Sequence, residues 1–350
     1  MIILNLLGKI QPICISQKLK LYIANLPKGD FNNWNGHLVE EMEDILKYSN
    51  IQTERFQKKY EEIKTLNVKE IFRSKYPQIP ISDMTESDCI QHIADEMICL
   101  YFDYNYDELP VGDWTNNCFD SRCCEKDYAG KIVDFIRLVC TEETHQKYPQ
   151  IPLINLYCVY SSDIYGLPDN CHIIFSGHTN IDKTIEDLCA FGALLDNFLN
   201  DEEDFYFLDY LCTELYEIEK ENFTPNHCQK LYSLCEFFLE KEYDRELDEK
   251  LPQFFNDFYS PDDKKKIATI ARQIRNKIAH GDFSKFRDKI EEYAVEIMES
   301  NNYWFDYSEY SRQNWAIMNL CFSLLDAIRN LSATILTDKE SIILLKNDKL

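Results

Sequence analysis

Apolar residues recur at every third or fourth position along most of the chain, which is the spacing of one face of an amphipathic helix. In the first half of the chain this pattern predicts three helices, over 36–49, 86–102 and 125–140. From about residue 181 onward the pattern is helical throughout and includes a long segment at 312–336. The spacing therefore predicts a mainly α fold.

Two short segments, 151–162 and 171–177, instead combine β-branched and aromatic residues without helical spacing. The turn-forming stretch DIYGLPDN separates them, so we expect them to pair as a β-hairpin. The apolar start of the chain, 1–15, fits either a buried strand or a short helix. We therefore expect a mostly helical N-terminal region with a short β-hairpin, 1–180, followed by a helical domain, 181–350.

One predicted helix has both of its ends marked in the sequence. Ser260 is a favourable N-cap, Pro261 suits the first helical position, and two aspartates follow where the helix dipole favours negative charge. Gly281 is typical of the position just past a helix C-terminus. These signals predict a helix over about 261–280.

The residues of this helix separate onto different faces at 100° per position. The stripe expected to face the core comprises Ile267, Ile270, Ala271, Ile274 and Ile278. Arg272, Asn276 and His280 are spaced by four residues and share a different face, and Arg275 lies on the flank between the two. A guanidinium, an amide and an imidazole thus gather near the end of the helix, within reach of a phosphate.

The distribution of charge supports a local anion site. The chain of 350 residues has a formal net charge of −24, which excludes nucleic-acid binding through its overall field. Residues 260–290 reverse this sign, with nine Lys and Arg residues against four Asp residues, so the segment nets +5 while the rest nets −29. A polyanion site is therefore expected on this segment.

The segment RNKIAH, from Arg275 to His280, resembles the R-x4-H signature of the HEPN superfamily. Asn276 stands at the polar position that often follows the arginine. The sequence AHG and its helical lead-in are most similar to the branch found in abortive-infection and other defence proteins. The resemblance covers about 181–340 and implies a C-terminal HEPN-like helical bundle.

A HEPN domain of this kind implies a metal-independent endoribonuclease, in which the RNA 2′-hydroxyl attacks the adjacent phosphate. His280 would be the acid/base group and Arg275 the phosphate clamp, while Asn276 would orient His280 or the phosphate. No metal and no cofactor are implied. Arg272 and Lys277 would either extend the RNA-binding surface or only keep an exposed face soluble.

The resemblance also implies partners. Family members usually build the site across a dimer, so one motif per chain implies a homodimer that acts on RNA. Toxins silenced by a partner nucleotidyltransferase carry a tyrosine two positions after the histidine, where this chain has Asp282, so that regulation is not expected. An antitoxin or trigger protein remains an expected partner, with 1–180 sensing the trigger or restraining the nuclease.

The expected cellular location is inferred from targeting signals that the sequence lacks. The start of the chain is a poor signal peptide, and no uncharged apolar stretch is long enough to predict a membrane span. The fourteen cysteines are spread along helical patterns and are interpreted as free, buried thiols in a reducing cytosol. A cytoplasmic protein is therefore expected.

Other interpretations of the same residues stay open. Arg275 and His280 are also compatible with a solvated helix end, and some HEPN domains only bind or dimerise. The alternatives are a non-catalytic HEPN module that binds RNA or a nucleotide and a helical interaction protein whose acidic surface meets a basic partner. Glu236 either approaches the motif or is only a polar residue between Leu234 and Phe237. One cluster could suggest a metal, but its spacing is not a standard zinc pattern, so no metal site is predicted: Cys118, Cys123, Cys124, Cys140 and His145.

Overall fold

The computed structural model describes residues 2–25, 69, 72–73, 76–102, 130–154, 158–161, 180–219, 223–240, 247–299 and 309–347. Most of these residues are helical, which confirms the expected mainly α fold. The chain divides into two compact units, one formed by 1–137 with 154–196 and the other by 138–153 with 197–350. This division differs from the expected boundary at residue 180, because nearly all of α7 (Ile181–Phe198) belongs to the first unit.

The first unit contains an antiparallel sheet of five strands in the order β2-β3-β4-β1-β5. Of the two alternatives for the start of the chain, the strand is correct, since β1 lies second from one edge of the sheet. The strand bounds are β1 (Ile2–Leu7), β2 (Ile13–Ser16), β3 (Leu21–Asn25), β4 (Met97–Phe102) and β5 (Cys158–Ser161).

The prediction of a single helix over 86–102 is wrong for its last six residues. Helix α4 (Glu86–Glu96) ends where β4 begins, and β4 pairs with both β1 and β3. The run MICLYF is apolar at every position, so periodicity could not distinguish a strand from a buried helix. Pairing on both sides decides it and leaves Ile98, Cys99 and Leu100 fully buried.

The predicted hairpin can be compared with the structure only in its first segment. Its first segment contains β5, which pairs with β1, and its second segment, 171–177, lies outside the described residues. A hairpin is formed instead by β2 and β3. The predicted helix at 36–49 also lies outside the described residues, whereas 130–139 of the one predicted at 125–140 is helical.

Helix α7 packs against the β2–β3 hairpin of the same unit. Its carboxylate Asp196 accepts a hydrogen bond from the Ser16 hydroxyl at 2.6 Å and from the backbone N–H groups of Gln17 and Lys18 at 2.9 and 3.1 Å. One turn earlier, Gly192 lies directly over the Ile15 carbonyl. The hairpin turn is therefore fixed by the last turns of α7.

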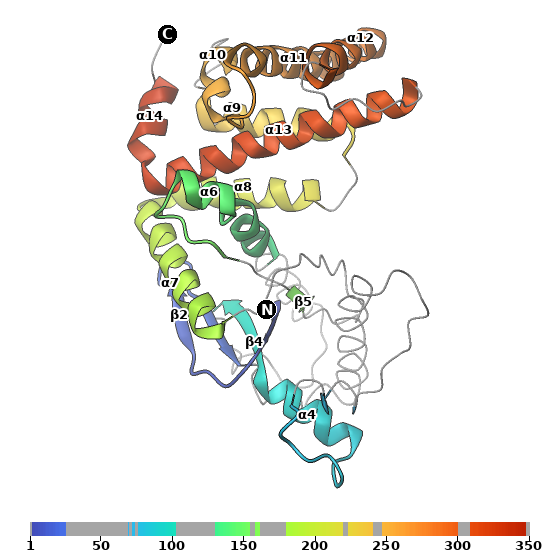
Figure 1. The fold of residues 1–350 in the computed structure, drawn as a ribbon. Coiled ribbons are helices and arrows are strands. Elements are labelled where there is room, and N and C mark those ends of the chain that lie inside the picture. Colours follow the sequence, from blue (N-terminus) through green and yellow to red (C-terminus); the bar gives the residue numbers. More distant parts are fainter. Residues whose placement is uncertain are drawn as a thin grey trace, which may run out of the picture. The chain divides into compact units, whose positions relative to one another are not determined.

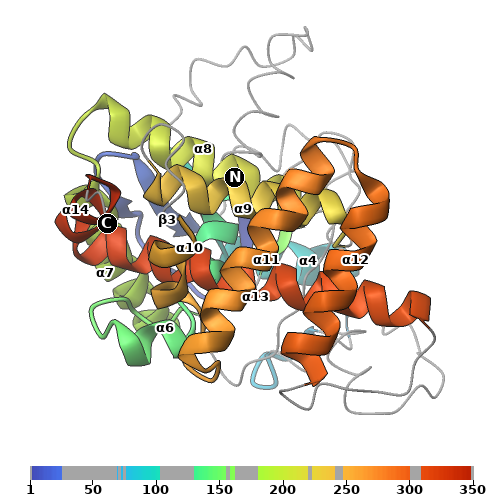
Figure 2. The same ribbon diagram turned by 90° about the horizontal axis from the view of Figure 1, so that it is seen from above.

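The second unit is a bundle in which α9 and α13 pack together and α11 packs on α9 (Figures 1 and 2). Figure 2 shows α11 and α12 running side by side across α13. The bounds are α6 (Glu142–Lys147), α8 (Glu202–Glu219), α9 (Pro225–Leu239), α10 (Leu247–Lys250), η2 (Leu251–Phe254), α11 (Pro261–Ala279), α12 (Phe283–Tyr293), η3 (Ala294–Glu299), α13 (Glu309–Thr337) and α14 (Lys339–Asn347).

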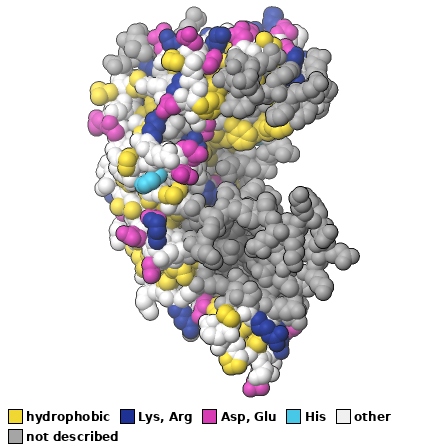
Figure 3. Space-filling model, viewed as in Figure 1, with side chains coloured by type: hydrophobic (Ala, Val, Ile, Leu, Met, Phe, Trp, Pro, Cys, Tyr) yellow, Lys and Arg dark blue, Asp and Glu magenta, His cyan; other side chains and the backbone are white. Residues whose placement is uncertain are grey.

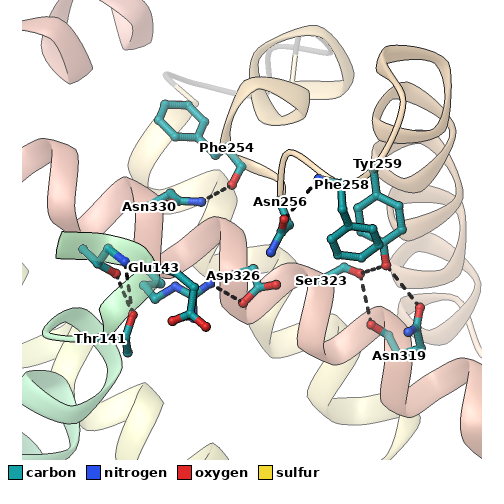
Figure 4. Close-up of polar contacts among 12 residues, drawn as sticks. Thr141, Glu143, Phe254, Asn256, Phe258, Tyr259, Asn319, Ser323, Asp326 and Asn330 are labelled. Carbon is teal, nitrogen blue, oxygen red and sulfur yellow. Dashed lines mark hydrogen bonds and ion pairs between the residues drawn. The ribbon is translucent and has the colours of Figure 1, made fainter. Parts of the chain in front are cut away.

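A line of polar residues on α13 holds the segment that leads into α11 (Figure 4). Asn330 donates to the Phe254 carbonyl at 2.7 Å, and the Tyr259 hydroxyl lies 3.1 Å from the Ser323 hydroxyl. From the end of α12, Tyr293 donates to the Asn319 side chain at 2.7 Å. Burial raises the pKa of Tyr293, so its hydroxyl stays protonated and donates. The α11–α12 hairpin is thus fixed to α13 at both of its chain ends.

Helix α13 is the one helix among the described residues that is long and apolar enough to cross a membrane. Within its most apolar window 67% of the helix is buried inside the bundle. Its polar line, described above, makes hydrogen bonds to the same bundle. These features are typical of the core helix of a soluble domain.

Candidate functional site

The helix that carries the motif begins and ends where the sequence predicts. Ser260 caps α11 by accepting the Asp263 backbone N–H, and Pro261 is its first residue. At the other end Gly281 adopts φ +67°, and its N–H donates to the Ile278 carbonyl while the Asp282 N–H donates to the Lys277 carbonyl. This pair of bonds is a Schellman motif, so the chain turns sharply directly after His280.

Replacing Gly281 with Ala is expected to destabilise the second unit by about 1 kcal/mol. A Cβ at this position would meet nothing within 4 Å, so the loss comes only from the left-handed backbone conformation. Denaturant unfolding of the two proteins would measure it. Gly281→Asn is the matched control and should lose less, because asparagine tolerates this conformation better than alanine. Equal stability of the alanine variant and the wild type would contradict the argument.

The two faces of α11 also lie as predicted. Ile267, Ile270, Ala271 and Ile274 are buried, and Ile278, the last residue of the stripe, is partly exposed. Helix α11 packs against α9, α12 and η2. Burial of this stripe sets the rotation of the helix, which leaves the polar residues of the motif at the surface.

Arg275 is held on the flank of α11 by two acceptors. Its Nη2 donates to Glu236 Oε2 at 2.8 Å and its Nη1 to Asn276 Oδ1 at 3.1 Å. The side chain of Arg275 is 33% exposed and that of Glu236 is 19% exposed. Of the two interpretations left open for Glu236, the structure therefore supports approach to the motif. The amide oxygen of Asn276 contacts Arg275, not His280.

His280 occupies the C-cap of α11, and its side chain is exposed. Its backbone N–H donates to the Asn276 carbonyl at 3.1 Å. Across the described part of the chain, its imidazole has no hydrogen-bond or ion-pair partner. The ring is consequently free to contact a ligand, and the protein contributes to its position only through the end of the helix.

Ion pairs engage the other basic residues more fully than the sequence suggests. Arg272 donates through Nε to both carboxylate oxygens of Asp248, at 3.0 and 2.9 Å. Lys277 and Lys285 both approach Asp282, at 3.7 and 3.2 Å. Arg272 therefore faces α10, and Lys277 lies beside the turn that follows the motif.

Seven of the nine basic residues in 260–290 make such pairs, and five of the six carboxylates that receive them lie outside this segment. These five match the segment's excess of five positive charges. Figure 3 shows basic and acidic side chains interspersed over the part of the molecule that carries α10 to α12. The predicted basic patch is thus largely compensated in three dimensions. The outside carboxylates are Glu236, Asp248, Asp257, Glu292 and Glu296.

The possible zinc cluster is only partly visible. Cys118, Cys123 and Cys124 lie outside the described residues. Cys140 is buried, and His145 Nδ1 contacts the Ile151 carbonyl at 2.6 Å, which fixes the ring locally. Within the ranges that the structure describes, no group of three His, Cys, Asp or Glu side chains could hold a metal ion. The nine cysteines whose side chains the structure describes are free thiols.

No protein-family model matches the sequence, and no curated protein or solved structure matches it significantly.

Proposed function

We propose that the protein is a metal-independent endoribonuclease of the HEPN type. The observation that supports this most is the arrangement at the end of α11, where His280 is exposed and Arg275 is oriented by Glu236 and Asn276. An exposed imidazole can move a proton at neutral pH, and a guanidinium can bind a phosphate with parallel N–H bonds. These two groups suffice for transfer within RNA, because the substrate supplies its own nucleophile.

In the proposed reaction the RNA 2′-oxygen forms a bond to the adjacent phosphorus and the bond to the 5′-oxygen breaks. The 2′-hydroxyl loses a proton and the departing 5′-oxygen gains one, with His280 as the acid/base group. Arg275 stabilises the negative charge that builds on the phosphate. The products are a 2′,3′-cyclic phosphate and a 5′-hydroxyl end, so neither water nor a metal enters this step.

Glu236 would act as a positioning residue for Arg275. Its carboxylate accepts from one nitrogen of the guanidinium, and Asn276 accepts from another, which leaves further N–H donors of the five for a phosphate. Glu236→Ala is expected to lower the cleavage rate about tenfold, because a hydrogen bond to a charged group contributes about 1.5–3 kcal/mol. Glu236→Gln keeps an acceptor and should lose less. Equal rates for the wild type and the alanine variant would remove Glu236 from the site.

The setting that the resemblance implies is a prokaryotic defence or toxin system in the cytoplasm. We propose that two chains form a homodimer that brings two motifs together. The N-terminal unit would sense a trigger protein or restrain the nuclease, or an antitoxin would do so. Asp282 in place of a tyrosine speaks against silencing by nucleotide transfer to this position.

A second function, a helical module that binds another protein without catalysis, is favoured by the ion pairs around the motif. Since most basic side chains of 260–290 already face carboxylates, the surface offers a phosphate chain fewer unengaged cations than the sequence suggests. A HEPN-like module that binds RNA or a nucleotide, or a helical protein-interaction module, would need no acid/base group. Salt-dependent RNA binding without turnover would identify the first of these.

The decisive experiment is incubation of the purified wild-type protein with single-stranded RNA in excess EDTA. We expect cleavage, with 2′,3′-cyclic phosphate ends on the products. Cleavage only after addition of a divalent metal, or products with other ends, would reject the mechanism. Binding without cleavage would support the non-catalytic alternative.

A further inference from the structure

The solvent-facing side of α8 combines acidic and aromatic residues. Residues 201–219 contain eight Asp and Glu residues and no Lys or Arg. Three aromatic side chains of this helix are exposed, Phe205 at 37%, Tyr206 at 67% and Tyr210 at 45%. Soluble helices seldom place several large rings in water on one face, and such surfaces usually bind a partner.

The helical spacing gathers these residues on one side. Tyr206 and Tyr210 are four residues apart, and the side chains of Glu202, Asp209 and Glu217 are exposed at neighbouring positions. The opposite side is the buried one, and it consists of Leu208, Leu211, Leu215 and Ile218. We call the exposed side, made of Glu202, Phe205, Tyr206, Asp209, Tyr210 and Glu217, the α8 face.

Within the bundle, the edge of this face already shows an ammonium group over an aromatic ring. Tyr210 contacts Phe237 of α9, with ring centroids 4.8 Å apart. Lys346 of α14 places its Nζ 5.7 Å from the centroid of the Phe237 ring. Phe237, which lies beside the α8 face, is thus already in contact with a cation of the same chain, whereas Tyr206 and Tyr210 remain exposed.

The side chains of the α8 face determine which kind of partner it can bind. Aromatic rings attract cations over their faces, and guanidinium groups also form paired hydrogen bonds to carboxylates. A surface with both groups and no positive charge on its helix repels RNA, so this face cannot serve the RNA-binding role proposed for α11. We propose that the α8 face binds a basic, arginine-bearing segment of a protein partner. This inference is independent of the proposed ribonuclease activity.

The test uses the full-length protein and a short labelled peptide in which arginines alternate with glycine and alanine. Fluorescence anisotropy should show saturable binding that weakens with salt, as expected for charge pairing. The variant Tyr206→Ala/Tyr210→Ala leaves the net charge unchanged and should bind the peptide about tenfold more weakly, from the loss of two cation–π contacts. Tyr206→Ala alone, at the most exposed ring, should show part of this loss without disturbing the contact with Phe237.

Two comparisons distinguish peptide binding at the α8 face from general attraction of a basic peptide to an acidic protein. Trp315→Ala/Phe322→Ala removes two exposed aromatic side chains from α13 and should leave peptide binding unchanged. A peptide with lysine in place of arginine should bind more weakly to the wild type. Equal affinity of the arginine peptide for the wild type and the tyrosine variants would overturn the proposal, as would an equal loss in the α13 variant.

Discussion

His280→Ala is expected to lower the rate of RNA cleavage by roughly 10²–10⁴-fold, the usual contribution of a general acid/base group. The imidazole is exposed and has no partner among the described residues, so no packing or hydrogen bond is lost with it. The backbone bonds that close α11 involve the N–H groups of residues 280 to 282 and are unaffected. The effect should therefore appear in the rate and not in stability, where we expect a change within about 0.5 kcal/mol.

The matched control for this variant is Lys265→Ala, an exposed position near the other end of the same helix. It should cleave RNA at nearly the wild-type rate. RNA binding by His280→Ala, measured at several salt concentrations, should remain close to that of the wild type, since the phosphate contacts assigned to Arg275 are kept. A variant that cleaves as fast as the wild type would end the assignment of His280, whereas a parallel loss of binding would indicate a contact role.

Gly192→Ala is expected to destabilise the first unit by about 2 kcal/mol. An ideal Cβ at Gly192 would lie 1.8 Å from the Ile15 carbonyl oxygen and 2.5 Å from its carbon. These are backbone atoms, so no side-chain rotation can relieve the clash, and the loss should be near the upper end of the roughly 1–3 kcal/mol typical of overpacking. The higher helix propensity of alanine offsets about 1 kcal/mol of it.

Hydrogen exchange measured by mass spectrometry would locate this loss. Protection of β2, β3 and α7 should fall about thirtyfold, while α9, α11 and α13 should exchange as in the wild type. Ala190→Gly, at an exposed position of the same helix, is the control for propensity, and it should cost about 1 kcal/mol without a change in packing. A Gly192→Ala protein more stable than the wild type would show that α7 does not approach β2 this closely.

The sequence by itself determined the parts of the site that depend on near neighbours. The cap at Ser260, the first-turn Pro261 and the stop at Gly281 are local signals, so they located both ends of α11 correctly. The spacing of the isoleucines also located its buried face, because helical geometry fixes which residues share a side. Thr224 and Pro225 mark the start of α9 by the same kind of local signal.

Only the tertiary structure could decide what lies opposite those residues. The 86–102 segment has an apolar run that fits a helix or a strand, and β4 forms because β1 and β3 supply backbone partners from distant parts of the chain. Glu236 meets Arg275 although 39 positions separate them, since α9 and α11 pack side by side. The compensation of the basic segment has the same origin. Formal charge adds along a sequence, but an ion's field is set by its neighbours in space, and here those neighbours are mostly carboxylates from outside the segment.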